Sequence, residues 1–471
     1  MKNISKQLSL SLLIIMSPFS LSLAEQTTAL INKTVNDSPK NIIIVIADGM
    51  GAAYTTAYRL FKDNLATPSI EPTIFDRHLT GLISTHPAPV SGYVTDSASA
   101  ATALFSGIKT FNGAIGVDSN NKPVESIADR AIKKGKKIGV VVTSQVYHAT
   151  PAAFLSHNKH RRNSVEIADS FIDKGIKVDL LFGGGSKKFI REDRNLVAEF
   201  KQAGFHYVDN YRQLNTLPSN KPVLGLFSHA ALPVALDDIN KHRLSAMTKA
   251  AIKHLDNVEY ENNHELQHKT NGSLVLIEAS QIDWAGHNND IAMAMAEVDD
   301  LAKTIIFLEK YVKKNPNSLV ILTADHSTGG LSLGAKGDYI WQPEMIRQLT
   351  LSTQYIAKTL YASPITEELC EALFKTTLTA IEIDKLKADK SNLLEQLEKN
   401  ETVKKNTAYK APPLYNSVVA LINHRTNTAW GTTGHTAVDV PLFSFGHQSH
   451  LFQGQLDNTD VAKIIFNLLA Q

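Results

Sequence analysis

The sequence predicts an α/β protein with a central, mostly parallel β-sheet and helices on both of its faces. Three observations predict this fold class. Continuous apolar runs rich in β-branched residues recur along the chain, as expected for strands that are buried on both faces. Helix-like stretches, such as 124–134 and 247–255, separate several of these runs. Polar side chains follow the runs at their carboxyl ends, where open α/β sheets bind their ligands.

The first buried strand is expected at residues 41–47, where the sequence NIIIVIA is followed by Asp48. Similar runs predict further strands at 138–142, 178–182, 223–227, 274–277, 319–322 and 440–445. Acids, histidines and hydroxyls follow several runs, at Asp48, 143–150, 278–287 and 325–326. Because the carboxyl ends of parallel strands meet at one edge of a sheet, we expect these polar residues to gather there.

The N-terminus has the pattern of a secretory signal peptide, residues 1–24. Two lysines precede an apolar stretch at 8–23, and small residues up to Ala24 form a cleavage site. A membrane anchor is the alternative, but serines and Pro18 interrupt the stretch, which is also short for a span. We therefore expect a secreted or periplasmic protein with no membrane span after cleavage, in which 25–471 form a single catalytic domain.

Composition and charge describe an ordinary globular protein with a sizeable core. The chain is 43% hydrophobic and 20% charged. Removal of the signal peptide takes away two lysines and no acid, so the formal net charge falls from +2 to zero. Nothing in that balance suggests nucleic acid as a partner. Cys370 is the single cysteine, so no intrachain disulfide can form and stability must come from the core, metal ions or oligomerisation.

A stretch from about 331 to 424 departs from the α/β pattern, and we interpret it as an insertion into the catalytic domain. Residues 366–404 are rich in Glu, Lys and Leu and predict amphipathic helices whose charges face solvent. The sequence GLSLG at 330–334 matches the G-x-S-x-G pattern of serine hydrolases, which needs a strand before it and a helix after it. Since 335–339 do not resemble the start of a helix, we expect a glycine-rich turn and not an esterase.

The sequence YVTDSASAATALFS, residues 93–106, predicts a helix of small residues with Asp96 at its N-cap and Ser97 in its first turn. Backbone N–H groups and the helix dipole favour an anion beside the Ser97 hydroxyl. Small neighbouring side chains would let a bulky anionic group approach. A capped serine-alanine helix is more often only structural, so this interpretation depends on other parts of the chain.

Three further clusters contain metal-ligating side chains. They are EASQIDWAGH at 278–287, TADHSTGG at 323–330 and GHT at 434–436. Together with Asp48 they supply oxygen and nitrogen ligands and no thiolate. Such a set suits Zn²⁺ with one position open for substrate, and all-oxygen positions suit Mg²⁺. The sequence therefore predicts a divalent-metal site at the edge of the sheet.

Six motifs resemble the alkaline phosphatase family, in order: IIIVIADGMG, VTDSASAATA, HATPAAF, IEASQIDWAGH, TADHSTGG and TTGHTAVDVPLFSFG. The resemblance runs from Asn41 to about Gly330 and from His424 to the C-terminus, and it does not cover the insertion. It implies an alkaline phosphatase-like fold and hydrolysis of phosphate monoesters through a phosphoserine at Ser97. Family members are commonly homodimers, so the insertion is a candidate for dimer contacts or for a lid over the site.

The resemblance also implies two zinc ions and one magnesium ion. One zinc, which activates the attacking water, would be held by Asp283, His287 and His435. The second zinc, which deprotonates Ser97, would be held by Asp48, Asp325 and His326. A third metal, usually magnesium, would be held by Asp48, Thr150 and Glu278.

Substrate contacts follow from the same resemblance. Arg161 lies eleven residues after Thr150, at the family's spacing for the arginine that clamps two phosphate oxygens. A guanidinium offers a planar bidentate fork that lysine lacks, and the preference for Arg161 over Arg162 depends on spacing alone. His148 and Trp284 stand where some members have aspartate and lysine, so both are candidates near the substrate. An outer-shell role is expected for His148, and Trp284 could equally be a structural aromatic at the rim.

Two other classes of protein share these features. A metal-dependent phosphodiesterase, phosphonate hydrolase or sulfatase would have similar zinc ligands but usually differs at the nucleophile, and Ser97 with Arg161 favours monoesters. A non-catalytic phosphate-binding protein would need the metal ligands but no nucleophile. We therefore expect a phosphatase that acts on small phosphate monoesters.

Overall fold

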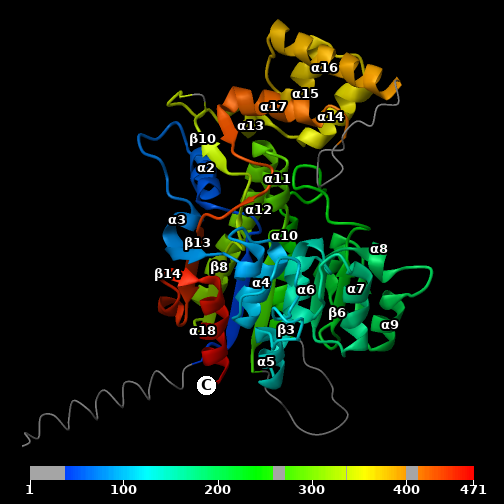
Figure 1. Ribbon diagram of the computed structural model, residues 1–471, viewed down its shortest axis with the longest axis vertical. Helices are drawn as coiled ribbons and strands as arrows, with labels where there is room; N and C mark the ends of the chain where they lie inside the picture. Colours follow the sequence, from blue (N-terminus) through cyan, green and yellow to red (C-terminus); the bar gives the residue numbers. More distant parts are fainter. Residues whose placement is uncertain (1–37, 258–270, 336, 399–411, 471) are drawn as a thin grey trace, which may run out of the picture. The chain divides into compact units, whose positions relative to one another are not determined.

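The central sheet is mixed and mostly parallel in the computed structural model, which describes residues 38–257, 271–335, 337–398 and 412–470 (Figure 1). Within these ranges ten strands form the sheet, in the order β14-β2-β13-β8-β1-β7-β3-β4-β6-β5. Their bounds are β1 Asn41–Ile46, β2 Leu79–Ser84, β3 Lys137–Gln145, β4 Leu180–Gly184, β5 His206–Val208, β6 Val223–Leu226, β7 Ser273–Glu278, β8 Ser318–Thr323, β13 Val440–Gly446 and β14 Gly454–Asp457. The predicted signal peptide lies outside the described residues.

Every apolar run predicted to be a strand overlaps a strand of this sheet, and the predicted fold class is confirmed. β1 pairs in parallel with β7 and β8, and β3 pairs in parallel with β4 and β7. One side of the sheet was not predicted: β13 runs antiparallel to both β8 and β2. β2 and β14 have mostly exposed or half-buried side chains, so they lack the continuous apolar run that identifies the central strands.

Helices cover both faces of the sheet. They are α2 Ala52–Lys62, α3 Ile74–His78, α4 Ser97–Ser106, α5 Ile127–Lys133, α6 Ala149–Leu155, α7 Ser164–Asp173, α8 Ser186–Phe189, α9 Leu196–Gln202, α10 Arg243–Asn257, α11 Gln281–His287, α12 Ile291–Lys314 and α18 Asn458–Ala470. Three 3₁₀ turns join them among the described residues, η1 Pro89–Ser91, η2 Tyr211–Thr216 and η3 Ser449–Leu451. None of the described helices is both long and apolar enough to cross a membrane.

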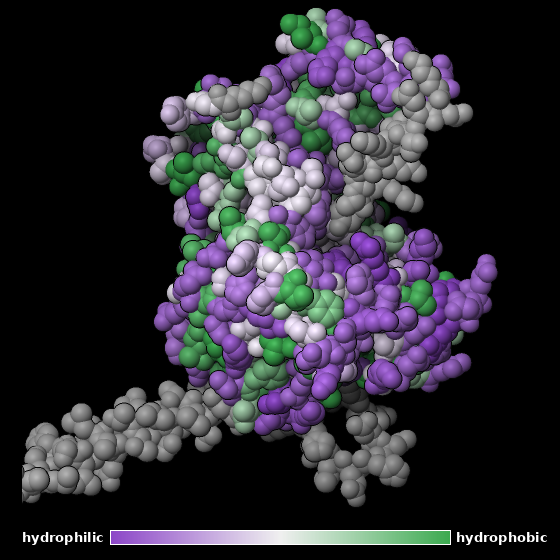
Figure 2. Space-filling view, in the orientation of Figure 1, coloured by the Kyte–Doolittle hydropathy of each residue, from purple (hydrophilic) through white to green (hydrophobic). Residues whose placement is uncertain are grey.

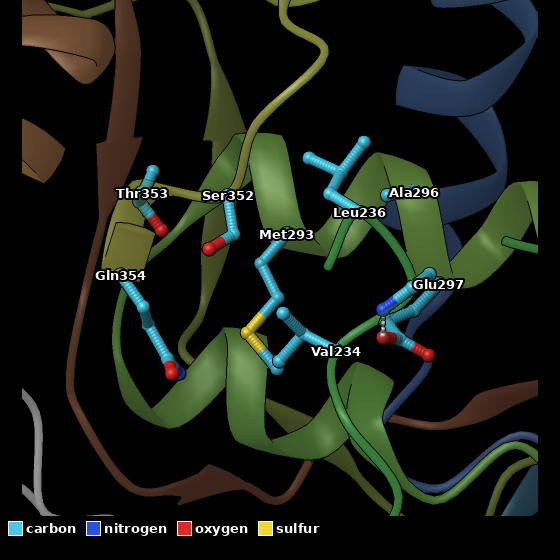
Figure 3. Close-up of a pocket in the computed structure, with 9 residues that line it drawn as sticks. Val234, Leu236, Met293, Ala296, Glu297, Ser352, Thr353 and Gln354 are labelled. Atoms are coloured by element: carbon cyan, nitrogen blue, oxygen red, sulfur yellow. Dashed lines mark hydrogen bonds between the residues drawn. The ribbon is translucent and has the colours of Figure 1, made fainter. Parts of the chain in front are cut away.

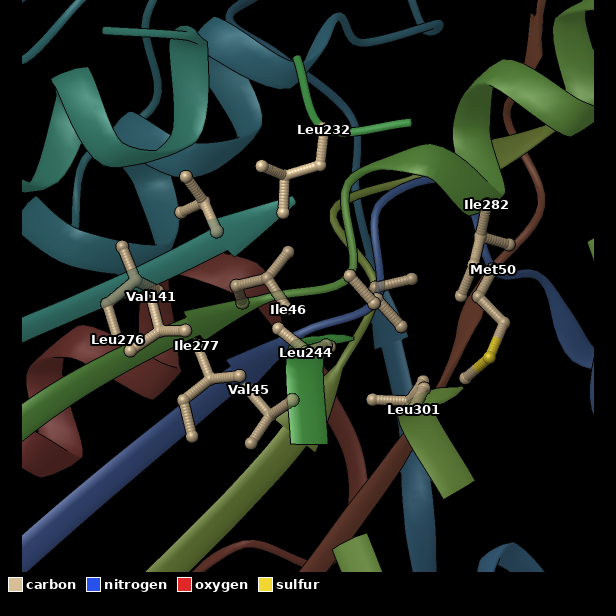
Figure 4. Packing of buried hydrophobic residues seen from close by; sticks show 14 of the residues in the cluster. Val45, Ile46, Met50, Val141, Leu232, Leu244, Leu276, Ile277, Ile282 and Leu301 are labelled. Carbon is tan, nitrogen blue, oxygen red and sulfur yellow. The ribbon is translucent and has the colours of Figure 1, made fainter. Parts of the chain in front are cut away.

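The core lies between the central strands and these helices. The crossover from β6 to β7 contains α10 and that from β7 to β8 contains α12, and the two helices pack against each other. Figure 4 shows Leu244 of α10 and Leu301 of α12 near Val45 and Ile46 of β1 and Ile277 of β7. The central strands are therefore held rigidly, and so are the loops that follow their carboxyl ends.

Among the described residues, the predicted insertion at 331–424 contains strand β10, treated below, and five helices, which we call the cap (Figure 1). They are α13 Glu344–Gln348, α14 Thr353–Ala362, α15 Glu367–Phe374, α16 Ala380–Glu398 and α17 Tyr415–Thr426. The helical prediction for 366–404 is confirmed for α15 and α16, and 399–404 lie outside the described residues. In the face shown in Figure 2 the cap is mostly hydrophilic, as expected for charges that face solvent.

The prediction of a glycine-rich turn at 330–334 is wrong. Leu331–Leu333 form strand β10, which pairs antiparallel with β11 Thr428–Trp430. A second short ribbon pairs β9 Ser327–Thr328 with β12 His435–Thr436. No helix begins between β10 and α13 in the part that the structure describes, so Ser332 is not on the strand-to-helix turn that an esterase nucleophile requires.

A buried ion cluster joins α10 to α12. The guanidinium of Arg243 is fully buried and donates to both carboxylate oxygens of Glu297, at 2.9 Å each, and to Asp300 at 3.1 Å. Asp300 also accepts the backbone N–H groups of Leu244 and Ser245, at 2.9 and 3.1 Å. The cluster therefore fixes the first turn of α10 against the middle of α12.

The Arg243→Met variant is expected to lose about 3 to 5 kcal/mol of unfolding free energy, because it leaves Glu297 and Asp300 buried without a counter-charge. Urea unfolding measures this difference. The control is Arg194→Met, which removes a partly exposed arginine paired with Asp173 and Glu199 and should cost no more than about 1 kcal/mol. Equal losses in the two variants would show that the buried cluster has no special role.

Candidate metal centre

The candidate site lies at the carboxyl ends of neighbouring central strands. Ile46 of β1 is opposite Glu278 of β7 and Thr323 of β8, so these three strands end at the same level. Asp48 follows β1, α11 follows β7, and Asp325 follows β8. This register brings residues that are far apart in the sequence to one edge of the sheet, as the sequence predicted.

In the first group, the imidazoles of His287 and His435 converge on Asp283. The two Nε2 atoms are 3.1 Å apart and lie 3.3 and 3.6 Å from the carboxylate oxygens of Asp283. Each Nδ1 faces a backbone carbonyl, that of Thr433 at 2.6 Å for His287 and that of Thr95 at 2.8 Å for His435. Because a carbonyl only accepts, each Nδ1 bears a proton, and each Nε2 offers a lone pair when its ring is neutral. A cation shared with Asp283 fits this arrangement.

The second group consists of Asp48, Asp325 and His326, all fully buried, with ligand atoms within 4.8 Å of one another. His326 Nε2 lies 3.2 Å from Asp325 Oδ2 and 3.6 Å from Asp48 Oδ1. No hydrogen-bond donor reaches either oxygen of Asp48. The ring of His326 stacks on that of His435 at 3.5 Å, so the first and second groups adjoin.

The third group contains Asp48, Glu278 and His148. Thr150, the residue expected there from the sequence, is buried in the first turn of α6, and its hydroxyl has no hydrogen-bond partner among the described residues. The structure places His148 close enough to be a metal ligand as well, whereas the sequence predicted only an outer-shell role for it. Ser144 also faces this group and donates from its hydroxyl to Glu278 at 3.3 Å.

Burial makes this collection of acids unfavourable unless a cation neutralises it. Burial raises the pKa of Asp48 well above its ordinary value, and it raises those of Asp325 and Glu278 to about 7. For Asp283 burial also raises the pKa, but the hydrogen bond from His287 and the nearby imidazoles lower it below its ordinary value. The buried carboxylate oxygens without a donor, both of Asp48, Oδ2 of Asp325 and Oε1 of Glu278, together with the imidazoles are a set of ligands that fits divalent cations.

Ser97 lies at the N-terminus of α4 and points toward the second group. Asp96 is the N-cap, as predicted, and accepts the backbone N–H of Ser99 at 3.0 Å. The Ser97 side chain is buried, and its Oγ lies 3.2 Å from His326 Nε2. All residues of α4 are buried, and its small side chains leave its first turn close to the metal-binding edge.

Arg161 lies beside Ser97 through its contact with Asp96. Its Nη1 donates to Asp96 Oδ2 at 3.0 Å, and its Nη2 lies 3.2 Å from His148 Nε2. Burial raises the pKa of Asp96, but Arg161 and the backbone donors of Ser99 and Gly113 lower it below its ordinary value, so the carboxylate stays ionised. Arg162 is exposed and its backbone N–H bonds His160, so it does not share this position.

Trp284 packs against His148 at the edge of the site. Their rings form an edge-to-face pair with centroids 6.1 Å apart, and Trp284 is 8% exposed. Burial and the charge of Arg161 lower the pKa of His148 to about 3, so its imidazole is neutral. The pair therefore forms an apolar wall beside Arg161.

Several residues that shape the site were not predicted. Thr328 donates from its hydroxyl to Asp283 at 2.5 Å and lies 3.2 Å from His326 Nδ1. The carbonyls of Thr95 and Thr433 orient two imidazoles, and Asp96 orients Arg161 in addition to capping α4. Backbone carbonyls have no signal in a sequence. The motif TADHSTGG contains Thr328, but its contact with Asp283 is known only from the distance between them in the structure.

The comparisons with known proteins point to one family. The family model described as alkaline phosphatase matches residues 39–471. Alkaline phosphatases 3 and 4 of Bacillus subtilis are 40% and 39% identical, covering 92% and 91% of this chain and 89% and 88% of their own lengths. The crystal structure of a cold-active alkaline phosphatase from a psychrophilic Shewanella sp. superposes with a TM-score of 0.80, at 40% identity, over 92% of this chain and all of that one.

Protein loaded with zinc and magnesium is expected to unfold at a higher temperature than chelator-treated protein, because bound cations relieve repulsion among the buried acids. A ligand present at 100 times its Kd stabilises by about 2.7 kcal/mol. Differential scanning fluorimetry measures the shift in Tm. Asp48→Asn should remove most of it, since Asp48 belongs to two groups, whereas Asp384→Asn, at an exposed position on α16, should not. An equal Tm with and without metals would contradict the assignment.

Proposed function

The chain belongs to the alkaline phosphatase family and is a phosphatase, and from this premise we propose that it hydrolyses phosphate monoesters through a covalent phosphoserine at Ser97. The observation that supports Ser97 is its place between two charged regions. Its Oγ lies 3.2 Å from His326, among the buried acids, while Asp96 next to it holds Arg161. A phosphoryl group at Ser97 would meet cations on one side and the guanidinium on the other.

The reaction has two displacements at phosphorus. Ser97 Oγ, having lost its proton to solvent, bonds to phosphorus while the ester P–O bond breaks and the alcohol leaves with a proton from water. Water then bonds to phosphorus and releases one proton to solvent, the P–Oγ bond breaks as Ser97 Oγ takes up a proton, and inorganic phosphate leaves. Phosphoryl transfer depends mainly on positioning and on neutralisation of charge, so the geometry of the site decides the rate.

We assign the cations to the groups described above. The two zinc ions would be held by Asp283, His287 and His435 and by Asp48, Asp325 and His326. The magnesium ion would be held by Asp48, Thr150 and Glu278, with His148 as a further candidate ligand. When bound, these ions would supply charge neutralisation and lower the pKa values of the Ser97 hydroxyl and of the attacking water.

Arg161 is the proposed phosphate clamp. Asp96 fixes its Nη1, and the neutral ring of His148 lies beside its Nη2, so the guanidinium is already oriented before substrate arrives. Pre-orientation reduces the entropy lost on binding, and a guanidinium bonds two phosphate oxygens at once. Trp284 and His148 would limit the space on this side and contact the substrate only at its edge.

Export and assembly complete the proposal. We propose that residues 1–24 are a signal peptide, that the mature protein is secreted or periplasmic, that 25–471 form one catalytic domain with the cap as an insertion, and that two chains form a homodimer. Size-exclusion chromatography with light scattering tests the dimer. N-terminal sequencing of protein from the periplasm or medium tests the cleavage after Ala24.

The Ser97→Ala variant is expected to lose at least about 10³-fold in kcat for p-nitrophenyl phosphate, because no covalent intermediate can form. The assay uses purified mature protein at alkaline pH with zinc and magnesium, and a chelator-treated sample should also be inactive. Metal content and Tm should remain those of the wild type. Wild-type protein that is metal-loaded but inactive would refute monoester hydrolysis and favour diesters, sulfate esters or simple phosphate binding.

Arg161→Lys is expected to lower kcat/KM by about 10- to 100-fold and to weaken inhibition by inorganic phosphate, because lysine cannot form the bidentate pair. Arg162→Lys is the matched control and should leave both quantities within about twofold of the wild type. If Arg162→Lys has the larger effect, the assignment of the clamp to Arg161 is wrong.

A further inference from the structure

The corner between α11 and α12 joins the proposed first zinc site to the cap. His287 is the last residue of α11, and Asp290 is the N-cap of α12, so only Asn288 and Asn289 lie between them. The backbone N–H of Asp290 returns to the carbonyl of Ala285 at 2.9 Å, which closes the corner tightly. A displacement of this corner would therefore move His287.

Asp290 binds the cap as well as its own helix. Its Oδ1 accepts the backbone N–H of Met293 at 3.0 Å, which caps α12. Its Oδ2 accepts two hydroxyls from the cap, that of Tyr415 in α17 at 2.7 Å and that of Thr353 in α14 by a short hydrogen bond. All three side chains are buried. One carboxylate therefore ties two cap helices to the residue that starts α12.

Asn289 provides a second connection on the other side of the corner. Its carbonyl accepts the side-chain amide of Asn423 in α17 at 2.8 Å. With its own amide oriented to satisfy its neighbours, Asn289 donates to the carbonyls of Gly286 and Thr432, at 2.9 Å each. Thr432 is next to Thr433, whose carbonyl orients the ring of His287. The cap is thus connected both to the backbone of His287 and to the loop that holds its imidazole.

A third attachment of the cap avoids this corner. Ser352, which precedes α14, bonds Asp237 through its backbone N–H at 3.1 Å and its hydroxyl at 2.5 Å. Figure 3 shows Ser352 and Thr353 around the same pocket as Met293 of α12 and Val234. Ser352 thus contributes to docking of the cap without contact to Asp290, and it provides an internal control.

We propose that the cap positions the first metal site, and that Asp290, Thr353, Tyr415 and Asn423 are positioning residues for His287. The inference rests on the proposed function, because it takes Asp283, His287 and His435 as the ligands of a zinc ion. Partners that orient metal-ligating histidines change metal affinity by about 10- to 100-fold when they are removed. The cap would then be required for a well-formed metal site, in addition to any effect on substrate access.

The test compares zinc loss from the full-length mature protein. Tyr415→Phe and Asn423→Ala are expected to accelerate transfer of one zinc ion per chain to a chromogenic chelator by about tenfold, because His287 is less well oriented. Their kcat should fall when zinc is limiting and recover when zinc is in excess, with little change in KM. Ser352→Ala should release zinc at the wild-type rate, although it removes the cap's hydrogen bond to the exposed Asp237 and the N-cap of α14.

The other outcomes overturn either the positioning role or the metal assignment. Wild-type zinc loss in Tyr415→Phe and Asn423→Ala would refute the positioning role. Equal acceleration in Ser352→Ala would also refute it, because general loosening of the cap would then be the cause. Wild-type protein that binds no zinc would refute the proposed metal assignment itself, and this inference with it. The conservative Tyr415→Phe keeps the buried ring, so a folded variant is available even if Asn423→Ala unfolds.

Discussion

The gathering of buried carboxylates at one edge of the sheet is the constraint on which the rest of the structure depends. Asp48, Glu278 and Asp325 emerge at one level because β1, β7 and β8 are parallel and in register. Burial raises their pKa values, and no hydrogen-bond donor reaches Asp48. Charged carboxylates in this arrangement are unfavourable without a cation, so the acids are better explained by metal binding than by folding.

A region of positive potential faces these acids. The N-terminus of α4 presents partial positive charge next to Ser97, and Arg161 adds a full charge held by Asp96. Asp96 has two functions, one for each carboxylate oxygen: one oxygen caps the helix, and the other binds the guanidinium. A dianionic phosphoryl group would fit between cations held by these acids and this region, whereas a neutral ester would gain little from either.

The sequence was sufficient to predict the parts of the fold that have a local signal. The run at 41–47 is continuously apolar, so β1 could be predicted as a buried strand of a parallel sheet. β2 and β14 have no such run, and the antiparallel direction of β13 depends on contacts distant in the chain. The same difference applies to the site. Asp48 and Ser97 lie in distinctive motifs, but the carbonyls of Thr95 and Thr433 and the contacts of Asp290 arise only from the folded chain.

The position of α12 explains why contacts in the cap can affect α11. Arg243 binds Glu297 and Asp300 in the middle of α12, which fixes this helix to α10 on one face of the sheet. Because Arg243 holds α12 in place, a displacement at Asp290 would not be absorbed by that helix. It would act on the short corner next to His287, where Asn289 adopts a left-handed conformation with φ of 54°. A fixed helix on one side and the cap on the other would therefore leave His287, the proposed ligand, as the part that responds.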